Sequence, residues 1–257
     1  MTDTSVLYET RDGIALITLN RPAQRNAIDT ALSDQIRAAI ERFETDPGLR
    51  VAVIAANGPV FCAGMDLKAF AAGEGDAILF GPGGLAGMVA RPRRKPVIAA
   101  VDGAALAGGF EIVLACDMVV AGDGAIFGLP EARIGLVAGA GGALRLGARM
   151  PRVVANEMLL TGAPISAARA MELGLLNRCV ASGKALEAAL ELAAQIAANA
   201  PLSLEASLHL ANLAEQRAEA AFWEENNRHL ARLAASDDAS EGIGAFIEKR
   251  APRWSAS

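Results

Sequence analysis

Short, continuous apolar runs alternate with segments of helical spacing, and this alternation constrains the fold of the chain most. Four such runs predict short strands: RVAVIAAN (50–57), KPVIAAV (95–101), DMVVAG (117–122) and AIFG (125–128). Two further strands, joined by an Asp-Gly turn, are predicted in VLYETRDGIALITLN (6–20). The alternation predicts an α/β fold, in which a sheet built from strand–helix units is stacked against helices.

Helices are predicted between and after these strands. Residues 30–45 place apolar side chains at helical spacing, and Thr30 is a suitable N-terminal cap. The glycine-rich residues 73–87 predict a mobile loop. From about residue 184 onward the sequence is rich in Ala and Leu and contains no predicted strand. The apolar faces of these late helices exceed what surface helices need, so they pack either against a neighbouring subunit or within the monomer.

The size and composition of the chain indicate a folded globular protein. Its 257 residues suit one large domain or a domain with an appendage, and 53% of them are hydrophobic. The formal net charge of −5 gives no indication of a nucleic-acid surface. We interpret the short basic run RPRRK (91–95) as a solvated loop before the next strand rather than as a nucleic-acid contact.

Neither a signal peptide nor a membrane span is predicted. Residues 1–13 contain no basic region and no long apolar region of the kind that a signal peptide needs. The apolar stretch 97–121 includes Asp102, Glu111 and Asp117, each of which would cost about 2.5–3.5 kcal/mol near a bilayer centre. We therefore expect a cytoplasmic protein that makes no membrane contact.

The cysteine and histidine content argues against several kinds of site. Cys62, Cys116 and Cys179 are widely spaced and odd in number, so they predict no disulfide framework and suit a reducing compartment. His209 and His229, the only histidines, fall in late helical sequence, which leaves a Ser-His-Asp or Cys-His mechanism without its base. No group of residues has the spacing of a metal site, so no metal is expected.

One glutamate lies inside an apolar run: Glu111 in GAALAGGFEIVLACD (103–117). No Lys or Arg lies within fifteen residues of it, and an isolated charge is costly to bury. It follows Gly108, Gly109 and Phe110, and two glycines that open a helix leave backbone N–H groups bare for a developing oxyanion. The alternative is that Glu111 faces solvent, which is the commoner case for a single Glu in an apolar helix.

A second junction of the same kind lies in CAGMDL (62–67). There Gly64 precedes Met65, and Asp66 can cap the helix that follows. Two N–H donors from two loops, converging on one carbonyl oxygen, would form an oxyanion hole.

A second isolated carboxylate, Glu131, directly follows Pro130, whose fixed φ sets the direction of the turn. Two glutamates in apolar surroundings form a candidate acid/base pair, with pKa values raised by desolvation and separated by mutual repulsion. An alternative role for Glu131 is a helix cap paired with Arg133. The glycines of GAGGAL (139–144) lack the full spacing of a dinucleotide fingerprint, so no Rossmann-type site is expected.

Six segments follow one another between residues 17 and 254: LNRP-x-x-x-NA, FCAGMDLK, KPVIAAVDGAALAGGFE, ACDMVVAG, FGLPEARIGLVAGAGG and AFIEKRAPRW. Together they resemble the crotonase, or enoyl-CoA hydratase/isomerase, superfamily. The resemblance implies an α/β fold of the crotonase (ClpP-like) type, a spiral of repeated ββα units, which we assign to residues 1–195. Residues 196–257 would form a helical oligomerisation region that supports a homotrimer or a hexamer built from two trimers.

The resemblance also implies the chemistry. Members bind acyl-coenzyme A thioesters, and no cofactor is expected beyond the coenzyme A of the substrate. The backbone N–H groups of Met65 and Gly108 would form the oxyanion hole. Glu111 would activate a water for attack on Cβ, Glu131 would deliver a proton to Cα, and the N–H of Gly139 would help to hold the water.

Contacts with coenzyme A are implied at eight positions: Gln24, Arg25, Ala63, Asp66, Leu67, Lys68, Phe246 and Lys249. For the basic residues among them, ordinary surface charge is an almost equally good explanation. The sequence departs from the family pattern at Ala107, where many hydratases carry a third glycine, and at Ala23, which replaces a frequent basic residue.

The expected reaction is syn addition of water to a trans-2-enoyl-CoA, giving a 3-hydroxyacyl-CoA. Segments 80–88 and 236–250 resemble crotonobetainyl-CoA (carnitinyl-CoA) hydratases, which gives an alternative substrate with a quaternary ammonium group. Aromatic cages bind such groups, but Phe80 is the only aromatic residue of the glycine-rich segment, so Glu74 or Asp76 would have to serve. A double-bond isomerase and a non-catalytic acyl-CoA-binding protein are further alternatives, both disfavoured by the intact glutamate pair.

Overall fold

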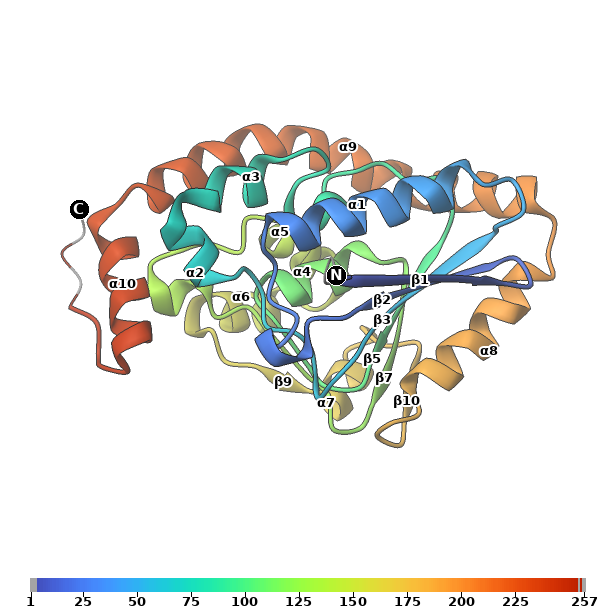
Figure 1. Ribbon diagram of the computed structural model, residues 1–257, viewed down its shortest axis with the longest axis horizontal. Coiled ribbons are helices and arrows are strands. Elements are labelled where there is room, and N and C mark those ends of the chain that lie inside the picture. The colour runs from blue at the N-terminus through green and yellow to red at the C-terminus, as the bar shows by residue number, and fades with distance from the viewer. Residues whose placement is uncertain (1–3, 254, 256–257) are drawn as a thin grey trace.

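The chain folds as an α/β protein in which helices enclose two sheets (Figure 1). The computed structural model describes residues 4–253 and 255, without the side chains at 214–222, 224 and 225 of one helix. Trp254, the last residue of the C-terminal family motif, lies outside the described residues. None of the described helices is both long and apolar enough to cross a membrane.

Most strands of the described chain belong to one sheet. Its order is β1 (Val6–Arg11), β2 (Ile14–Leu19), β3 (Val51–Ala56), β5 (Val97–Val101), β7 (Met118–Gly122) and β10 (Arg178–Val180). Strands β1 and β2 pair antiparallel around the predicted Asp-Gly turn, where Asp12 and Gly13 both have positive φ. The remaining neighbours pair in parallel, and the inner strands are buried on both faces, which explains their unbroken apolar sequence.

The second sheet repeats the order of the first on a smaller scale. It contains β4 (Val60–Cys62), β6 (Ala104–Leu106), β8 (Ile126–Gly128) and β9 (Ile165–Ser166), of which only β9 pairs antiparallel. Each of β3, β5 and β7 is followed by one short strand of this sheet and then by helical structure. The predicted spiral of ββα units is therefore confirmed. The short strands themselves were not all predicted, because runs of three residues carry little periodicity.

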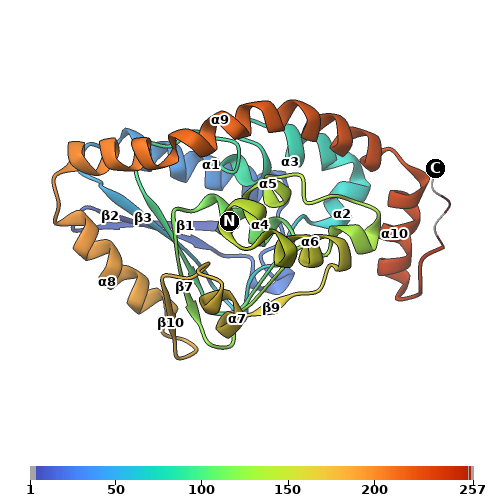
Figure 2. The same cartoon turned by 180° about the vertical axis from the view of Figure 1, so that it is seen from behind.

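Helices surround both sheets. Their bounds are α1 (Thr30–Thr45), α2 (Leu67–Ala69), α3 (Gly75–Phe80), α4 (Gly108–Ala115), α5 (Gly142–Arg149), α6 (Arg152–Thr161), α7 (Ala167–Glu172), α8 (Ala185–Ala197), α9 (Pro201–Ala234) and α10 (Asp237–Glu248). Shorter helical turns are η1 (Pro22–Gln24), η2 (Phe70–Glu74), η3 (Leu85–Gly87) and η4 (Glu131–Ile134). Helix α8 packs on β3, β5 and β7, whereas α9 runs along the same side of the molecule as α1 and α3 (Figure 2).

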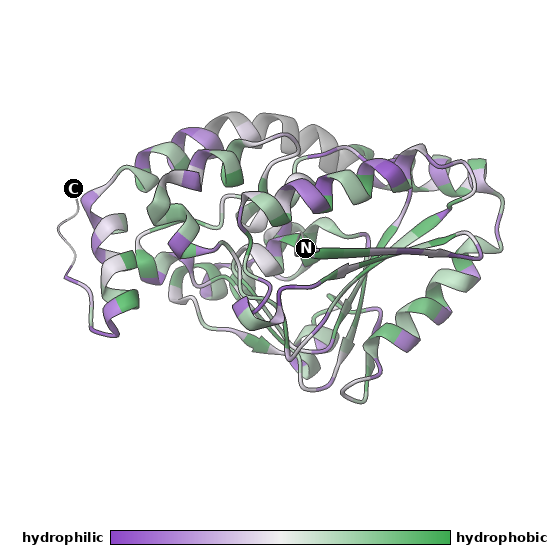
Figure 3. Ribbon diagram, in the orientation of Figure 1, coloured by the Kyte–Doolittle hydropathy of each residue, from purple (hydrophilic) through white to green (hydrophobic). Residues whose placement is uncertain are grey.

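The distribution of hydropathy explains why these helices lie where they do. Hydrophobic residues run through the strands, while the outer helices alternate hydrophobic and hydrophilic residues (Figure 3). Helix α8 buries Ala185, Ala189 and Ala193 against the first sheet, and such small side chains allow the helix to approach the sheet closely. Helix α1 buries Leu32, Ile36 and other apolar residues in the larger core cluster. The assignment of residues 196–257 to a separate oligomerisation region stays a prediction.

The prediction of a mobile loop at residues 73–87 is wrong. This glycine-rich segment forms helix α3 and the turn η3. Gly73, Gly83 and Gly84 have positive φ and make the turns between these short helical pieces, so the glycines punctuate structure rather than prevent it.

Two other local predictions were wrong. The cap of α1 is Asp29, whose carboxylate accepts from the Leu32 N–H at 2.8 Å, and Thr30 is the first helical residue. The run 91–95 is not a solvated loop, because Arg93 forms a largely buried ion pair with Asp117 at 2.8 Å. The same run ends at Lys95, which is buried and donates to the backbone carbonyls of Phe43 and Asp46.

The start of α4 is set by close backbone packing. A Cβ added to Gly109 would lie 2.2 Å from the Cys62 carbonyl oxygen, so α4 can pack on β4 only without a side chain there. Ala107, the cap residue of α4, has φ +49° and ψ −129°, a conformation that favours glycine. The third glycine of many hydratases therefore has a conformational reason, and this chain keeps the conformation with an alanine.

We expect Gly109→Ala to lower the free energy of unfolding by about 3 kcal/mol, because the added methyl overlaps the β4 backbone. The matched control is Gly147→Ala, at an exposed position of α5 where an added Cβ meets nothing within 4 Å. That change should raise the free energy by about 0.5–1 kcal/mol. Urea unfolding of both variants measures the difference. Equal changes in the free energy of unfolding would contradict the conclusion that α4 packs on β4 only without a side chain at position 109.

Candidate active site

Three parallel strands of the second sheet place three loops around one cavity. The loop after β4 contributes Ala63 and Met65, the loop after β6 contributes Ala107 and Gly108, and the turn after β8 contributes Glu131. Because neighbouring parallel strands end at the same edge of a sheet, these loops are adjacent in space. The cavity has a volume of about 400 Å³.

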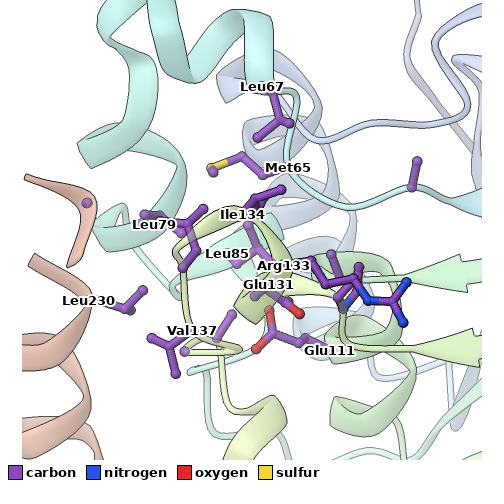
Figure 4. A pocket seen from close by; sticks show the side chains of 18 of the residues that line it. Met65, Leu67, Leu79, Leu85, Glu111, Glu131, Arg133, Ile134, Val137 and Leu230 are labelled. Atoms are coloured by element: carbon purple, nitrogen blue, oxygen red, sulfur yellow. The ribbon is translucent and has the colours of Figure 1, made fainter. Parts of the chain in front are cut away.

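The cavity wall is largely apolar. Its remaining lining comes from α2, α3, η3 and η4, from the loop that precedes α5, and from α9 and α10, and Figure 4 shows most of these side chains. Leu79, Leu85, Val137 and Leu230 face the interior from four different segments. The walls therefore keep water away from any charged group that they enclose.

Met65 and Gly108 each present a bare backbone N–H at the cavity. Ile28 and Met65 form a parallel bridge, in which the Ile28 N–H donates to the Gly64 carbonyl and the Asp66 N–H donates to the Ile28 carbonyl. In this pattern the N–H of Met65 itself points away from Ile28. Gly108 is the first residue of α4, whose N–H has no acceptor within the helix. Among the residues that the structure describes, neither N–H has a hydrogen-bond acceptor.

The two N–H groups belong to loops in direct contact. A Cβ added to Gly64 would lie 3.1 Å from the Gly108 nitrogen and 2.6 Å from the Ala107 Cβ. This approach, together with φ +97° at Gly64, requires glycine at that position. The arrangement is suited to two donors that bind one oxyanion, the role predicted for Met65 and Gly108.

Glu111 lies in the first turn of α4 and is only 4% exposed, so it does not face solvent. Its Oε1 accepts from the Gly142 N–H at 2.9 Å. Burial raises the pKa of Glu111 to about 7, although hydrogen bonds from Gly142 and Ala140 and the charge of Arg145 act to lower it. Glu111 can therefore release and accept a proton near neutral pH.

Glu131 begins η4 and is 7% exposed, and its Oε2 has no hydrogen-bond partner among the described residues. It does not pair with Arg133, whose Nε donates to the Thr161 carbonyl at 2.8 Å. Burial raises the pKa of Glu131 well above its usual value, and the nearby charge of Glu111 raises it further. Burial and the neighbouring carboxylate therefore both favour the protonated form of Glu131.

The two carboxyl groups point toward one another across the cavity floor (Figure 4). One ionised and one protonated carboxyl group in a shared apolar site can act as base and acid in the same reaction. Next to the bare N–H groups of Met65 and Gly108, this arrangement can move protons to and from carbon atoms close to a polarised carbonyl group.

The comparisons with known proteins agree with this geometry. The sequence pattern of the family described as enoyl-CoA hydratase/isomerase matches residues 9–257. This chain belongs to the enoyl-CoA hydratase/isomerase family. A carnitinyl-CoA dehydratase of Proteus mirabilis is 43% identical over 259 residues, which cover 97% of this chain and 98% of that protein.

Solved structures of family members have the same crotonase fold. A carnitinyl-CoA hydratase from Mycobacterium avium superimposes with a TM-score of 0.95 at 45% identity, covering 100% of both chains. An enoyl-CoA hydratase from Mycobacterium tuberculosis H37Rv is also 45% identical and covers 99% of this chain and 100% of its own, with a TM-score of 0.80. Relatives with two different substrate names are thus equally similar in sequence.

Within this family fold, the eight positions predicted to contact coenzyme A are not all at the cavity. Ala63, Leu67 and Phe246 line it. Gln24 and Arg25 are exposed near its rim, where the Ala63 N–H donates to the Arg25 carbonyl at 3.1 Å.

Three of these positions lie beside the cavity rather than on its wall. The Asp66 carboxylate caps α2, accepting from the Lys68 N–H at 3.1 Å, and Lys68 itself is exposed. Lys249 is exposed at the end of α10. Phe246, on the same helix, lines the cavity of its own chain. All eight contacts stay predictions.

The backbone at Gly139 also lines the cavity, but its N–H donates to the Val137 carbonyl at 2.7 Å. This turn must open, or the N–H must be shared, before Gly139 can hold a water, so its role stays a prediction. The Gly139 carbonyl accepts from Asn226 Nδ2 at 2.6 Å, a contact that the sequence did not reveal. A single asparagine on a polar helix carries no pattern that would identify it.

Other chemistries find little support among the described residues. No group of three or more His, Cys, Asp or Glu side chains that could hold a metal ion occurs there. Cys62 is close to the oxyanion loops, but burial raises the pKa of its thiol to about 12. This thiol stays protonated at neutral pH and is a poor nucleophile.

The raised pKa values make the glutamate pair destabilising at high pH. Because folding favours the neutral carboxyl groups, the stability that they contribute is complete below about pH 4 and is lost as the pH rises through the folded pKa values. We therefore expect Glu131→Gln to raise the free energy of unfolding by about 1 kcal/mol or more at about pH 8.5, with little effect at about pH 5.

The matched control for this prediction is Glu157→Gln, the same chemical change at an exposed position of α6. It should leave the stability unchanged at both pH values. Urea unfolding of the three proteins provides the measurement. A wild type and a Glu131→Gln variant that respond identically to pH would show that Glu131 is not held neutral by the fold.

Proposed function

We propose that this protein is a hydro-lyase that adds water reversibly to the double bond of a trans-2-enoyl-CoA thioester. One observation carries the proposal: Glu111 and Glu131 are buried together in an apolar cavity, beside two backbone N–H groups without acceptors. A hydratase needs a base for water, an acid for carbon and a site for negative charge on oxygen, and this cavity offers all three.

In the proposed reaction, the thioester oxygen accepts hydrogen bonds from the N–H groups of Met65 and Gly108. Glu111 removes a proton from the water, and the water oxygen forms a bond to Cβ while the π electrons move toward the thioester oxygen. The two donors stabilise this enolate more than the substrate, which lowers the barrier. Glu131 then gives its proton to Cα, and the C=O bond is restored.

The roles follow from the hydrogen bonds, since an N–H donor stabilises ionised Glu111 while Glu131 Oε2 has no partner among the described residues and is held protonated by burial. After the addition Glu111 holds a proton and Glu131 is ionised, so exchange of a proton between them or with solvent restores the starting state. The two carboxyl groups point toward one another (Figure 4), so they can act on the same face of a double bond placed between them. We therefore propose syn addition.

As the substrate pair we propose crotonobetainyl-CoA and carnitinyl-CoA. The support comes from relatives named carnitinyl-CoA dehydratase or hydratase, which match nearly the whole chain at 43% and 45% identity. The cationic group would lie close to the ionised member of the glutamate pair and to Phe246, the aromatic residue of the cavity wall. Glu74 does not line the described cavity, and it accepts from the Thr30 N–H instead.

A second candidate is a 2-enoyl-CoA with a plain alkyl tail. Leu79, Leu85, Val137 and Leu230 form an apolar wall that suits such a tail, and a relative of 45% identity is named enoyl-CoA hydratase. An isomerase would need only one proton-transferring group, and a non-catalytic binding protein would need neither glutamate.

We also propose roles for the C-terminal helices and for the exposed residues around the cavity. Leu202 and Leu210 of α9 are 79% and 69% exposed, and apolar side chains of this size suit contacts between subunits of a trimer or of a hexamer. Gln24, Arg25 and Lys68 would contact the nucleotide end of coenzyme A, and Lys249 would reach it from α10. The reaction as written uses no cofactor.

With crotonyl-CoA as substrate, we expect Glu111→Gln and Glu131→Gln each to reduce kcat by about 10² or more, because each removes one proton-transfer step. Loss of the enoyl-thioester absorbance measures the rate, and Glu157→Gln serves as the control of unchanged activity. Wild-type turnover that survives both substitutions would exclude the two-carboxylate mechanism. Thioester binding without any turnover would favour a binding protein.

The substrate is tested with crotonobetainyl-CoA and its neutral isostere, in which a carbon atom replaces the ammonium nitrogen. Since the two have the same shape, their kcat/KM ratio isolates recognition of charge. We expect the cationic substrate to be preferred by about tenfold or more, which corresponds to about 1.4 kcal/mol. Equal values, or a preference for the isostere and for crotonyl-CoA, would favour the alkyl substrate instead.

A further inference from the structure

Helix α9 packs three side chains of one face against the loop 139–142, whose Gly142 N–H donates to Glu111. Trp223, Asn226 and Leu230 are spaced three and four residues apart, so they lie on the same face of the helix. A Cβ added to Gly139 would lie 2.5 Å from Leu230 Cγ, and one added to Gly141 would lie 3.6 Å from the Trp223 ring. At Gly139 the loop and the helix therefore pack without space for a side chain, and at Gly141 they are close enough for van der Waals contact.

Asn226 is the polar member of this face. It is 7% exposed, and its Nδ2 donates to the Gly139 carbonyl at 2.6 Å. This bond fixes one end of the short loop 139–142. A loop that is fixed in this way keeps its backbone N–H groups in a set direction.

The loop that Asn226 binds also donates to the glutamate of α4. Its Gly142 N–H donates to Oε1 of Glu111 at 2.9 Å, and hydrogen bonds from this loop act to lower the pKa of Glu111. The charged groups that face Glu111 are Glu131 from η4 and Arg145 from α5. Asn226 is neutral and does not touch the carboxylate, so it can act only through the loop 139–142.

We propose that Asn226 is a positioning residue of this active site: by binding the Gly139 carbonyl, it holds the loop 139–142, and with it the Gly142 N–H, against Glu111. The proposal rests on the hydratase function proposed above, because it assigns Glu111 the role of base. It links the C-terminal helix α9 to proton transfer at a carboxylate more than a hundred residues earlier in the chain.

A merely structural role for Asn226 makes a different prediction. A buried carbonyl that loses its partner costs stability wherever it occurs, by about 1–3 kcal/mol. It would not alter the titration of Glu111 or the rate of the chemical step. A positioning role changes both, because a displaced donor stabilises the carboxylate less and raises the pKa of Glu111.

The test compares the wild type with Asn226→Leu, which has a similar volume but no donor, and with Asn226→Gln, which keeps an amide. Asn212→Leu is the matched control, since Asn212 is a partly buried asparagine of the same helix that faces Asp117. Each protein is followed through kcat, KM and the pH profile of kcat/KM with crotonyl-CoA. Carbon-13 NMR of labelled glutamate follows the titration of Glu111 without substrate.

For Asn226→Leu we expect kcat to fall about tenfold with KM nearly unchanged, and the acid limb of the profile to move up by about half a pH unit or more. Asn226→Gln should restore most of the rate, and Asn212→Leu should match the wild type. A folded Asn226→Leu variant with the wild-type titration and kcat would overturn the proposal. So would equal losses in the Leu and Gln variants.

If Asn226→Leu does not fold, an NMR titration of the wild type alone tests the proposed link. The amide proton signal of Gly142 should then follow the titration of Glu111, and a signal that stays constant would break the proposed link. The NMR titration also separates the two proposals. An inactive wild type with an Asn226-dependent titration would contradict the hydratase function only, whereas an active enzyme with an unaffected titration would contradict the role of Asn226 only.

Discussion

The exclusion of water from two carboxyl groups is the constraint on which the rest of this structure depends. A buried charge is costly unless hydrogen bonds or opposite charges compensate it, and Glu111 and Glu131 are compensated unequally. Glu111 has backbone donors and the charge of Arg145, whereas Glu131 has an oxygen without a partner among the described residues. In the proposed reaction, this inequality makes Glu111 the base and Glu131 the acid.

The crotonase fold brings these groups together by repeating one unit. Each of three turns of the spiral adds a strand to both sheets, and the short strands β4, β6 and β8 of the second sheet end beside the cavity. One turn supplies Met65, the next supplies Gly108 and Glu111, and the third supplies Glu131. The chemistry therefore needs no long loop, because stacking of the units alone sets the distances between these groups.

Much of this arrangement could be predicted from the sequence, because the relevant residues break a local pattern. Glu111 is conspicuous as the one charge between Asp102 and Asp117 in an otherwise apolar run, and paired glycines mark the tight backbone contacts around it. The helix over 75–80 was missed because glycines that serve as turns resemble those of a loop. Asn226 could not be found, since its meaning depends on packing between α9 and Gly139 that no local pattern records.

The position of α9 over the cavity has a consequence for biosynthesis. A chain made from its N-terminus completes both sheets, both glutamates and both oxyanion loops before Asn226, Leu230 and Phe246 exist. Domains begin to fold during synthesis, so a nascent chain can bury its acid and base while the wall above them is still missing. Catalytic competence then arrives last, and a product of interrupted translation would hold reactive carboxyl groups in an open, hydrated cleft without the enclosure that gives them their pKa values.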